Sequence, residues 1–188
     1  MSRIKLIESS QVSGELADIY AELQKTRGGT VPNLFMAMGY SAAMLGPAMK
    51  AADFVTTESK VSVKYKQLAY LATSRLNQCE YCLVRHSVAG LKAGLTEAQI
   101  ATFYQEGDLA SHPVFDRREQ AIIRFAEELT RTAQMNHDSF NAFREFFSDE
   151  EIVEVAYCVS VANMFNRLVS GLGIELEPEM KTLNFAQQ

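Results

Sequence analysis

A chain of 188 residues, 47% of them hydrophobic, is long enough to bury a core, and one or at most two domains are expected. The formal net charge of −5 argues against partners that require a basic face, such as nucleic acid or an anionic membrane surface. The expected partner is therefore a small molecule or another protein.

The N-terminal stretch MSRIKLIESSQVSGEL contains no apolar run that could serve as a signal peptide. No later segment approaches the roughly 20 apolar residues of a membrane span. We therefore expect a cytoplasmic protein. Three cysteines in so long a chain do not form a disulfide scaffold, and a reducing compartment disfavours a structural disulfide.

Helical periodicity recurs along the chain and strand signals hardly appear, so the predicted fold class is all-α. Ser13 is the expected N-cap of a first helix that ends at Gly28-Gly29. Two helices follow over 32–57, where Pro47 leaves their boundaries open. Ser62 then caps a helix whose apolar residues continue to Leu76.

The stretch NQC interrupts the pattern, so that the next helix is expected to start at the cysteines and to stop at Gly94. Thr96 and Gln99 form a capping box for a short helix, and Ser148 and Glu151 form another for the last long one. The remaining elements are a helix over 116–132, a short helix carrying Phe140, Phe143 and Phe147, and a polar tail after Gly171 or Gly173. The total is about eight helices.

We predict a single domain over 1–188, with a dithiol core at about 62–106, because no linker rich in Pro, Gly or Ser divides the chain. The segments KQLAYLATSRLN from Lys66 and VEVAYCVSVANM from Val153 resemble each other, and each follows a serine-capped helix start. A weak internal duplication is one interpretation of this similarity, and chance resemblance between short helices is the other.

The stretch NQCEYCLVRH carries the strongest chemical signal. A helix that begins near Cys79 directs its N-terminal N–H groups and the positive end of its dipole toward both sulfurs, which favours thiolate over thiol. Cys82 and His86 are four residues apart and share one helix face, so the imidazole can accept the thiol proton directly or through a water. The spacing thus supplies a nucleophile, a base and a resolving thiol for reduction of a peroxide.

Two alternatives compete with a reactive dithiol. A zinc site could use Cys79, Cys82 and His86, but the other donors, namely Cys158, His112, His137 and the carboxylates, show no second paired spacing. The cysteines could also be small buried apolar residues, which is how we interpret Cys158. His112 and His137 lie at a loop and at an expected helix start, so neither is assigned to the site, and we expect no metal or cofactor.

The segment LATSRLNQCEYCLVRHSVAGLKAGLTEAQI closely resembles the core of the carboxymuconolactone decarboxylase-like superfamily, and within it the alkylhydroperoxidase D-like branch. VPNLFMAMGYSAAML and FNRLVSGLGIELEP extend the resemblance, to the group of peroxidase-related enzymes, over nearly the whole chain. The resemblance implies an all-helical fold, assembly as a homotrimer or homohexamer, and reduction of hydroperoxides with electrons from a lipoyl or thioredoxin-like dithiol.

By this resemblance Cys82 is the peroxidatic thiol and Cys79 the more exposed resolving thiol. The family places a glutamate of its proton relay twelve residues before the first cysteine, and here that position is Gln67. A glutamine holds a hydrogen bond but cannot accept a proton, so the relay must be shortened, rely on His86 alone, or recruit another carboxylate. Some members place a relay histidine between the cysteines, where this chain has Tyr81.

The leading hypothesis is a thiol-dependent peroxidase for organic hydroperoxides that serves antioxidant defence, with Cys82, Cys79, His86 and Gln67 as the site. A thiol–disulfide oxidoreductase without a peroxide substrate and a non-catalytic redox sensor remain as alternatives. Lactone decarboxylation is disfavoured, because the branch with that activity does not rely on this cysteine pair.

Overall fold

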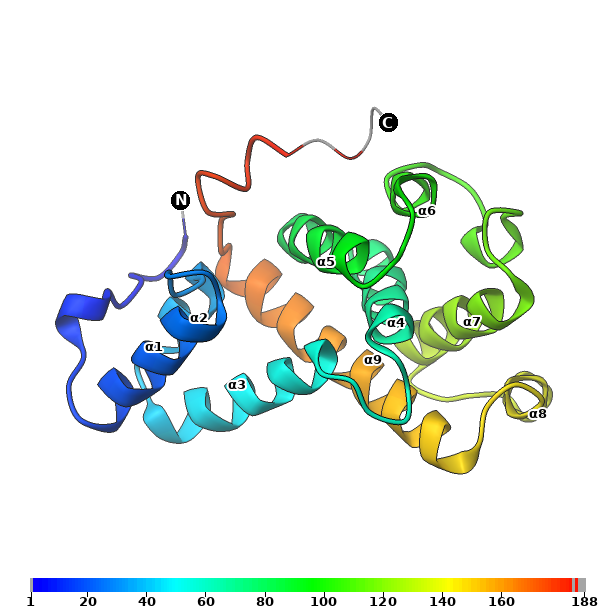
Figure 1. Ribbon diagram of the computed structural model, residues 1–188, viewed down its shortest axis with the longest axis horizontal. Coiled ribbons are helices and arrows are strands. Elements are labelled where there is room, and N and C mark those ends of the chain that lie inside the picture. The colour runs from blue at the N-terminus through cyan, green and yellow to red at the C-terminus, as the bar shows by residue number, and fades with distance from the viewer. Residues whose placement is uncertain (1, 184, 186–188) are drawn as a thin grey trace.

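The computed structural model describes residues 2–183 and 185, and within these residues it is all-helical, as predicted (Figure 1). Its elements are two short 3-10 helices, Ser9–Gln11 and Leu109–Ser111, and the α-helices α1 (Glu15–Thr26), α2 (Asn33–Met38), α3 (Ala42–Thr56), α4 (Val63–Leu76), α5 (Glu80–Lys92), α6 (Glu97–Thr102), α7 (Arg117–Thr132), α8 (His137–Arg144) and α9 (Asp149–Leu172).

Polar side chains set most of the predicted helix starts. Ser62 accepts a hydrogen bond from the backbone N–H of Tyr65, and the capping boxes beginning at Thr96 and Ser148 are both formed, which confirms these predictions. The predicted cap at Ser13 is wrong. Helix α1 has Gly14 as its N-cap, with a φ of 57° that glycine adopts without steric cost.

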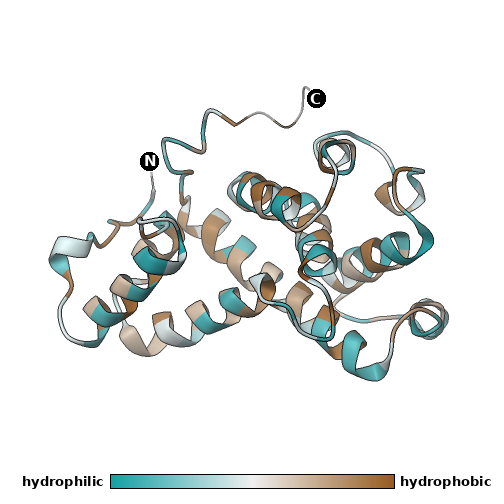
Figure 2. Cartoon of the chain, in the orientation of Figure 1, coloured by the Kyte–Doolittle hydropathy of each residue, from teal (hydrophilic) through white to brown (hydrophobic). Residues whose placement is uncertain are grey.

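Helix α4 forms the centre of the fold and packs against α5, α7 and α9 (Figure 1). Every residue from Lys66 to Ser74 is buried, so this helix is enclosed on all sides. Helix α9 is long and apolar enough to cross a membrane by length and composition alone, but half of that stretch is buried against other helices. Figure 2 shows apolar and polar segments alternating along the helices, as expected where one face of each points to the core.

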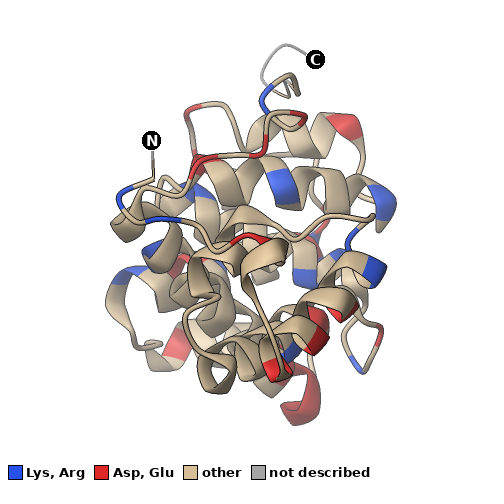
Figure 3. Ribbon diagram, turned by 90° about the vertical axis from the view of Figure 1, so that its left-hand side faces the viewer, with Lys and Arg blue, Asp and Glu red and all other residues tan. Residues whose placement is uncertain are grey.

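The segment after α9 is not the polar tail that the sequence suggested. Ile174, Glu177 and Phe185 are buried, and the ring of Phe185 stacks on Tyr104 with centroids 5.8 Å apart. Glu177 reaches back to α5, where it contacts Tyr81 and Arg85. Figure 3, which faces the left-hand side of Figure 1, shows basic and acidic residues interspersed there. The C-terminal segment therefore covers part of the dithiol region.

Candidate functional site

The turn between α4 and α5 holds both cysteines. Cys79 is the N-cap of α5 and Cys82 lies in its first turn, so the expectation that the cysteines start a helix is confirmed. Their Cα atoms are 5.3 Å apart and their sulfurs form a disulfide. The residue before Cys79, Gln78, has a φ of 53°, a conformation that a non-glycine side chain adopts at a cost.

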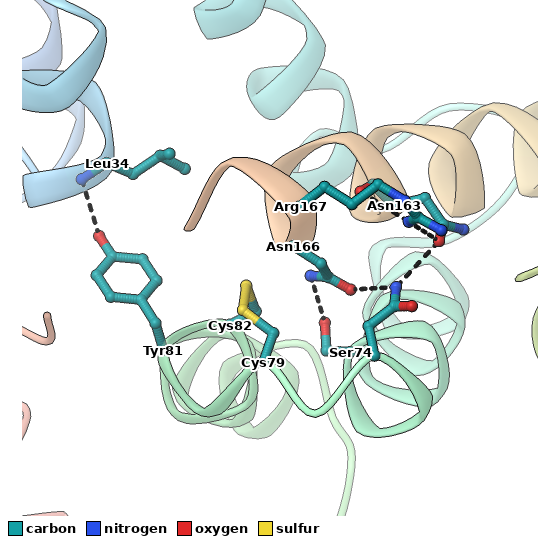
Figure 4. The surroundings of a disulfide bond; sticks show 9 residues. Leu34, Ser74, Cys79, Tyr81, Cys82, Asn163, Asn166 and Arg167 are labelled. Carbon is teal, nitrogen blue, oxygen red and sulfur yellow. Dashed lines mark hydrogen bonds between the residues drawn. A yellow bond between two sulfur atoms is a disulfide. The ribbon is translucent and has the colours of Figure 1, made fainter. Parts of the chain in front are cut away.

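An asparagine network holds this turn against α9 (Figure 4). The amide of Asn77 donates to Asn163 at 3.0 Å and to Asn166 at 2.9 Å, and Asn166 in turn donates to the hydroxyl of Ser74 at 3.1 Å. The backbone N–H of Cys79 also bonds to the carbonyl of Ser74, at 2.9 Å. The last helix thus fixes the position of the dithiol.

Replacing Asn166 with alanine is expected to lower the free energy of unfolding by about 1–3 kcal/mol, because buried amide and hydroxyl groups lose their partners. Disulfide closure should also slow, since the turn is less well held. Urea denaturation and stopped-flow oxidation of the reduced protein measure the two effects. Asn141→Ala, at an exposed position of α8, is the control, and equal effects of both substitutions would contradict the role given to the network.

Gln67 and His86 are in direct contact across the α4–α5 interface. The amide nitrogen of Gln67 donates to the carbonyl of Val55 at 3.0 Å, which leaves its oxygen, 2.8 Å from Nδ1 of His86, as an acceptor. Nδ1 of His86 must therefore carry the proton, and Nε2 is left with a free lone pair. Glutamine at this position thus selects one tautomer of the histidine.

The pKa of His86 falls from 6.5 to about 3, mainly because burial disfavours the charged ring and secondarily because of Arg85 and Arg27. The ring also stacks on Tyr70, with centroids 3.5 Å apart. His86 is therefore neutral in the disulfide form. A thiolate on Cys82, one turn away, would favour the charged ring and raise this pKa.

Cys82 and His86 both line a cavity of about 120 Å³. Its walls are aromatic and apolar, and they include Tyr70, Tyr81, Phe35 and Phe165. Cys79 lies instead on a separate surface groove, bounded by the end of α9 and by the segment from Ile174 to Lys181. Cys82 and Cys79, although joined by the disulfide, thus line different pockets.

The relative exposure implied by the family resemblance is not found. Cys79 is 1% exposed and Cys82 is 3% exposed, so Cys79 is not the more accessible of the two. The reason is local, since the asparagine network and the C-terminal segment both cover the start of α5.

Four side chains around the cavity were absent from the predicted site. Arg85 forms an ion pair with Glu177 at 2.9 Å, and the hydroxyl of Tyr81 donates to the same carboxylate at 2.9 Å. Arg27, from the end of α1, is paired with Asp53 on α3. Arg85 could have been found from its position three residues after Cys82, on nearly the same helix face. Arg27 and Glu177 come from distant segments and carry no local signal.

The remaining cysteine and histidines lie outside this site. Cys158 is buried, as expected, and burial raises the pKa of its thiol to about 12. His112 accepts a backbone hydrogen bond from Val114 in a loop, and His137 is exposed at the start of α8. No three His, Cys, Asp or Glu side chains in the described part of the chain come together in a way that could hold a metal ion.

Several known proteins resemble this chain in sequence or in fold. Residues 43–128 match the carboxymuconolactone decarboxylase family. A peroxidase-related protein of Silicibacter sp. TM1040 shares 22% identity and a TM-score of 0.82, covering 100% of this chain and 95% of its own. An alkylhydroperoxidase AhpD core protein of Ralstonia eutropha JMP134 shares 24% identity and a TM-score of 0.78, covering 95% and 94%.

A third similar structure is a cysteine-to-alanine variant of the debrominase Bmp8 in complex with 2,3,4-tribromopyrrole. It shares 14% identity and a TM-score of 0.80, and 96% of each chain is covered. At these identities the three structures establish the fold, and the family match covers the helices that carry the dithiol. The chain therefore has the fold of these peroxidase-related structures, and its residues 43–128 match the carboxymuconolactone decarboxylase family.

Proposed function

We propose that the protein is a thiol-dependent peroxidase in which Cys82 attacks the hydroperoxide and Cys79 resolves the product. The observation that carries the proposal is the shared cavity: Cys82 and His86 line it together, while Cys79 lines a different pocket. A substrate in the cavity meets Cys82, and a reductant in the groove meets Cys79.

The cycle has three balanced steps. The Cys82 thiolate attacks the terminal oxygen of ROOH, the O–O bond breaks, and the products are a sulfenic acid and, with one proton, the alcohol ROH. The Cys79 thiol then displaces the sulfenic hydroxyl as water and forms the disulfide. A donor dithiol reduces this disulfide by two successive exchanges and is itself oxidised to a disulfide.

Four groups favour the Cys82 thiolate in this scheme. The N-terminus of α5 directs its positive dipole end at the sulfur, and the two guanidinium groups of Arg27 and Arg85 line the same cavity. His86, held with Nε2 unprotonated by Gln67, is the acceptor for the thiol proton. Gln67 therefore acts as a positioning residue at the place where the family has a relay glutamate.

The proposal also includes the partners, assembly and compartment that the family resemblance and the sequence lead us to expect. The electron donor is a lipoyl or thioredoxin-like dithiol, the assembly is a homotrimer or homohexamer, and the compartment is the cytoplasm. Lys181 and Glu175 line the groove beside Cys79, and we propose that the donor approaches Cys79 from this groove.

The proposal is tested by comparing two substrates under steady-state conditions with a dithiol donor. Reduction of cumene hydroperoxide faster than of a model disulfide supports the peroxidase. The reverse order would favour a thiol–disulfide oxidoreductase. A single oxidation without turnover, accompanied by a change in elution volume, would favour a redox sensor.

A second candidate is reductive removal of bromine from a small aromatic ring. The aromatic walls of the cavity and its volume, close to the ~150 Å³ that admits benzene, favour such a ligand. Two thiols would supply the electrons, so that ArBr gives ArH and bromide while Cys79 and Cys82 form the disulfide. Consumption of tribromopyrrole with loss of two thiols per molecule, and no reaction with cumene hydroperoxide, would establish this activity instead.

A further inference from the structure

The charged side chains that line the cavity between Cys82 and His86 are all basic. Arg27 and Arg85 both line it, but Asp53 and Glu177, the carboxylates that pair with them, do not. In each ion pair, therefore, the arginine lines the cavity and the carboxylate does not. His86, the third titratable nitrogen group there, is neutral, so an acceptor inside the cavity meets two positive charges.

Each arginine has N–H donors that its ion pair does not use. A guanidinium carries five N–H donors, yet the described residues offer one ion-pair partner to Arg27 and one to Arg85. Nε of Arg27 is buried and has no hydrogen-bond partner. A buried donor without a partner is costly and rare in folded proteins, and this one is available to an acceptor that binds beside Arg27.

The two guanidinium groups are held in place. Arg27 is anchored by Asp53 from α3, and Arg85 is anchored by Glu177 and lies over the ring of Tyr81 at 5.7 Å. They come from helices far apart in the sequence, α1 and α5, and they repel each other, which disfavours their approach unless an anion sits between them. Such an arrangement fits the planar, bidentate acceptor that a carboxylate provides.

We propose that Arg27 and Arg85 form a carboxylate-binding subsite beside Cys82, so that the preferred substrates are small, monocyclic or branched organic hydroperoxides that also carry a carboxylate. This inference rests on the proposed peroxidase function for the hydroperoxide group, but the anion subsite itself does not. The remaining walls, including Leu34, Val55 and Ala89, contact the apolar body of the ligand.

The two arginines could instead serve only to stabilise the Cys82 thiolate. That role would affect every substrate equally, whereas a carboxylate subsite affects only substrates and ligands with the anion. A matched pair of ligands that differ in charge alone therefore separates the two roles.

The test measures binding of 4-isopropylbenzoate and of the neutral 4-isopropylbenzamide to the oxidised wild-type protein by titration calorimetry. Because the disulfide form carries out no reduction, the result does not depend on peroxidase activity. The benzoate should bind at least tenfold more tightly than the amide. Arg27→Gln should remove that preference and Arg27→Lys should restore part of it, while Arg131→Gln, an exposed position on α7, should leave it unchanged.

Arg27 is chosen because its partner Asp53 is 43% exposed, so the substitution strands no buried carboxylate. A second measurement uses kcat/KM for cumene hydroperoxide and its para-carboxylated analogue, and the loss caused by Arg27→Gln should be at least tenfold larger for the carboxylated substrate than for cumene hydroperoxide. Equal binding of the two ligands, binding of neither, or an equal loss for both hydroperoxides would overturn the subsite. Failure of both hydroperoxides to react while the benzoate preference holds would refute the peroxidase and leave the subsite standing.

Discussion

Replacing Cys82 with serine is expected to abolish peroxide turnover, with a loss on the order of 10³-fold or more, because a serine hydroxyl in this cavity cannot form the sulfenic acid. Replacing Cys79 with serine should leave a sulfenic acid on Cys82 without a disulfide. A sulfenic-acid-specific reagent and the rate of cumene hydroperoxide consumption measure the two outcomes.

Cys158→Ala is the matched control, because Cys158 is buried against α4, where its thiol donates to the carbonyl of Lys66, and it does not line the cavity. This variant should retain turnover even if its stability falls. Retained turnover in the Cys82→Ser protein, or a sulfenic acid on Cys79 in place of Cys82, would contradict the assignment of the nucleophile.

The disulfide form should lose stability as the pH falls below about 6.5, with a contribution from His86 of about 1–2 kcal/mol by pH 5. The pKa of this ring is about 3 in the fold and 6.5 in the unfolded chain. Between these two pKa values the ring binds a proton in the unfolded state but not in the native state, so lowering the pH favours unfolding. The contribution stops growing near pH 3, where the native ring also becomes protonated.

Urea denaturation of the oxidised protein at pH 7 and pH 5 measures this effect. The difference between the two free energies of unfolding should be smaller in His86→Gln than in the wild type by about 1–2 kcal/mol. His137→Gln, at an exposed position, should behave like the wild type. An unchanged pH dependence in His86→Gln would show that the ring is not held neutral in the fold.

Much of the fold could be predicted because its signals are local. Ser62, Thr96 and Ser148 each precede an apolar run at helical spacing, and each caps the helix expected of it. Gly14 shows the limit of such signals, since a glycine with positive φ begins α1 one residue after the serine that has the better capping side chain. The two 3-10 helices also carry no periodicity long enough to detect.

The site could be predicted in part for the same reason. Cys79, Cys82 and His86 lie within one helix start, where spacing alone brings them to one region. The contact between Gln67 and His86 joins two helices, and the family resemblance rather than spacing drew attention to Gln67. Arg27 and Glu177 are 150 residues apart in the sequence, and tertiary packing alone brings each to the region of the cavity. Hydrophobic periodicity cannot reveal a charged residue that only tertiary packing brings to the site.

The most direct test is a count of free thiols in the reduced, metal-free protein before and after one equivalent of cumene hydroperoxide, with peptide mapping of any new bond. We expect loss of two thiols, formation of a Cys79–Cys82 disulfide much faster than the oxidation of free cysteine, and an intact Cys158. Survival of all three thiols would contradict this expectation.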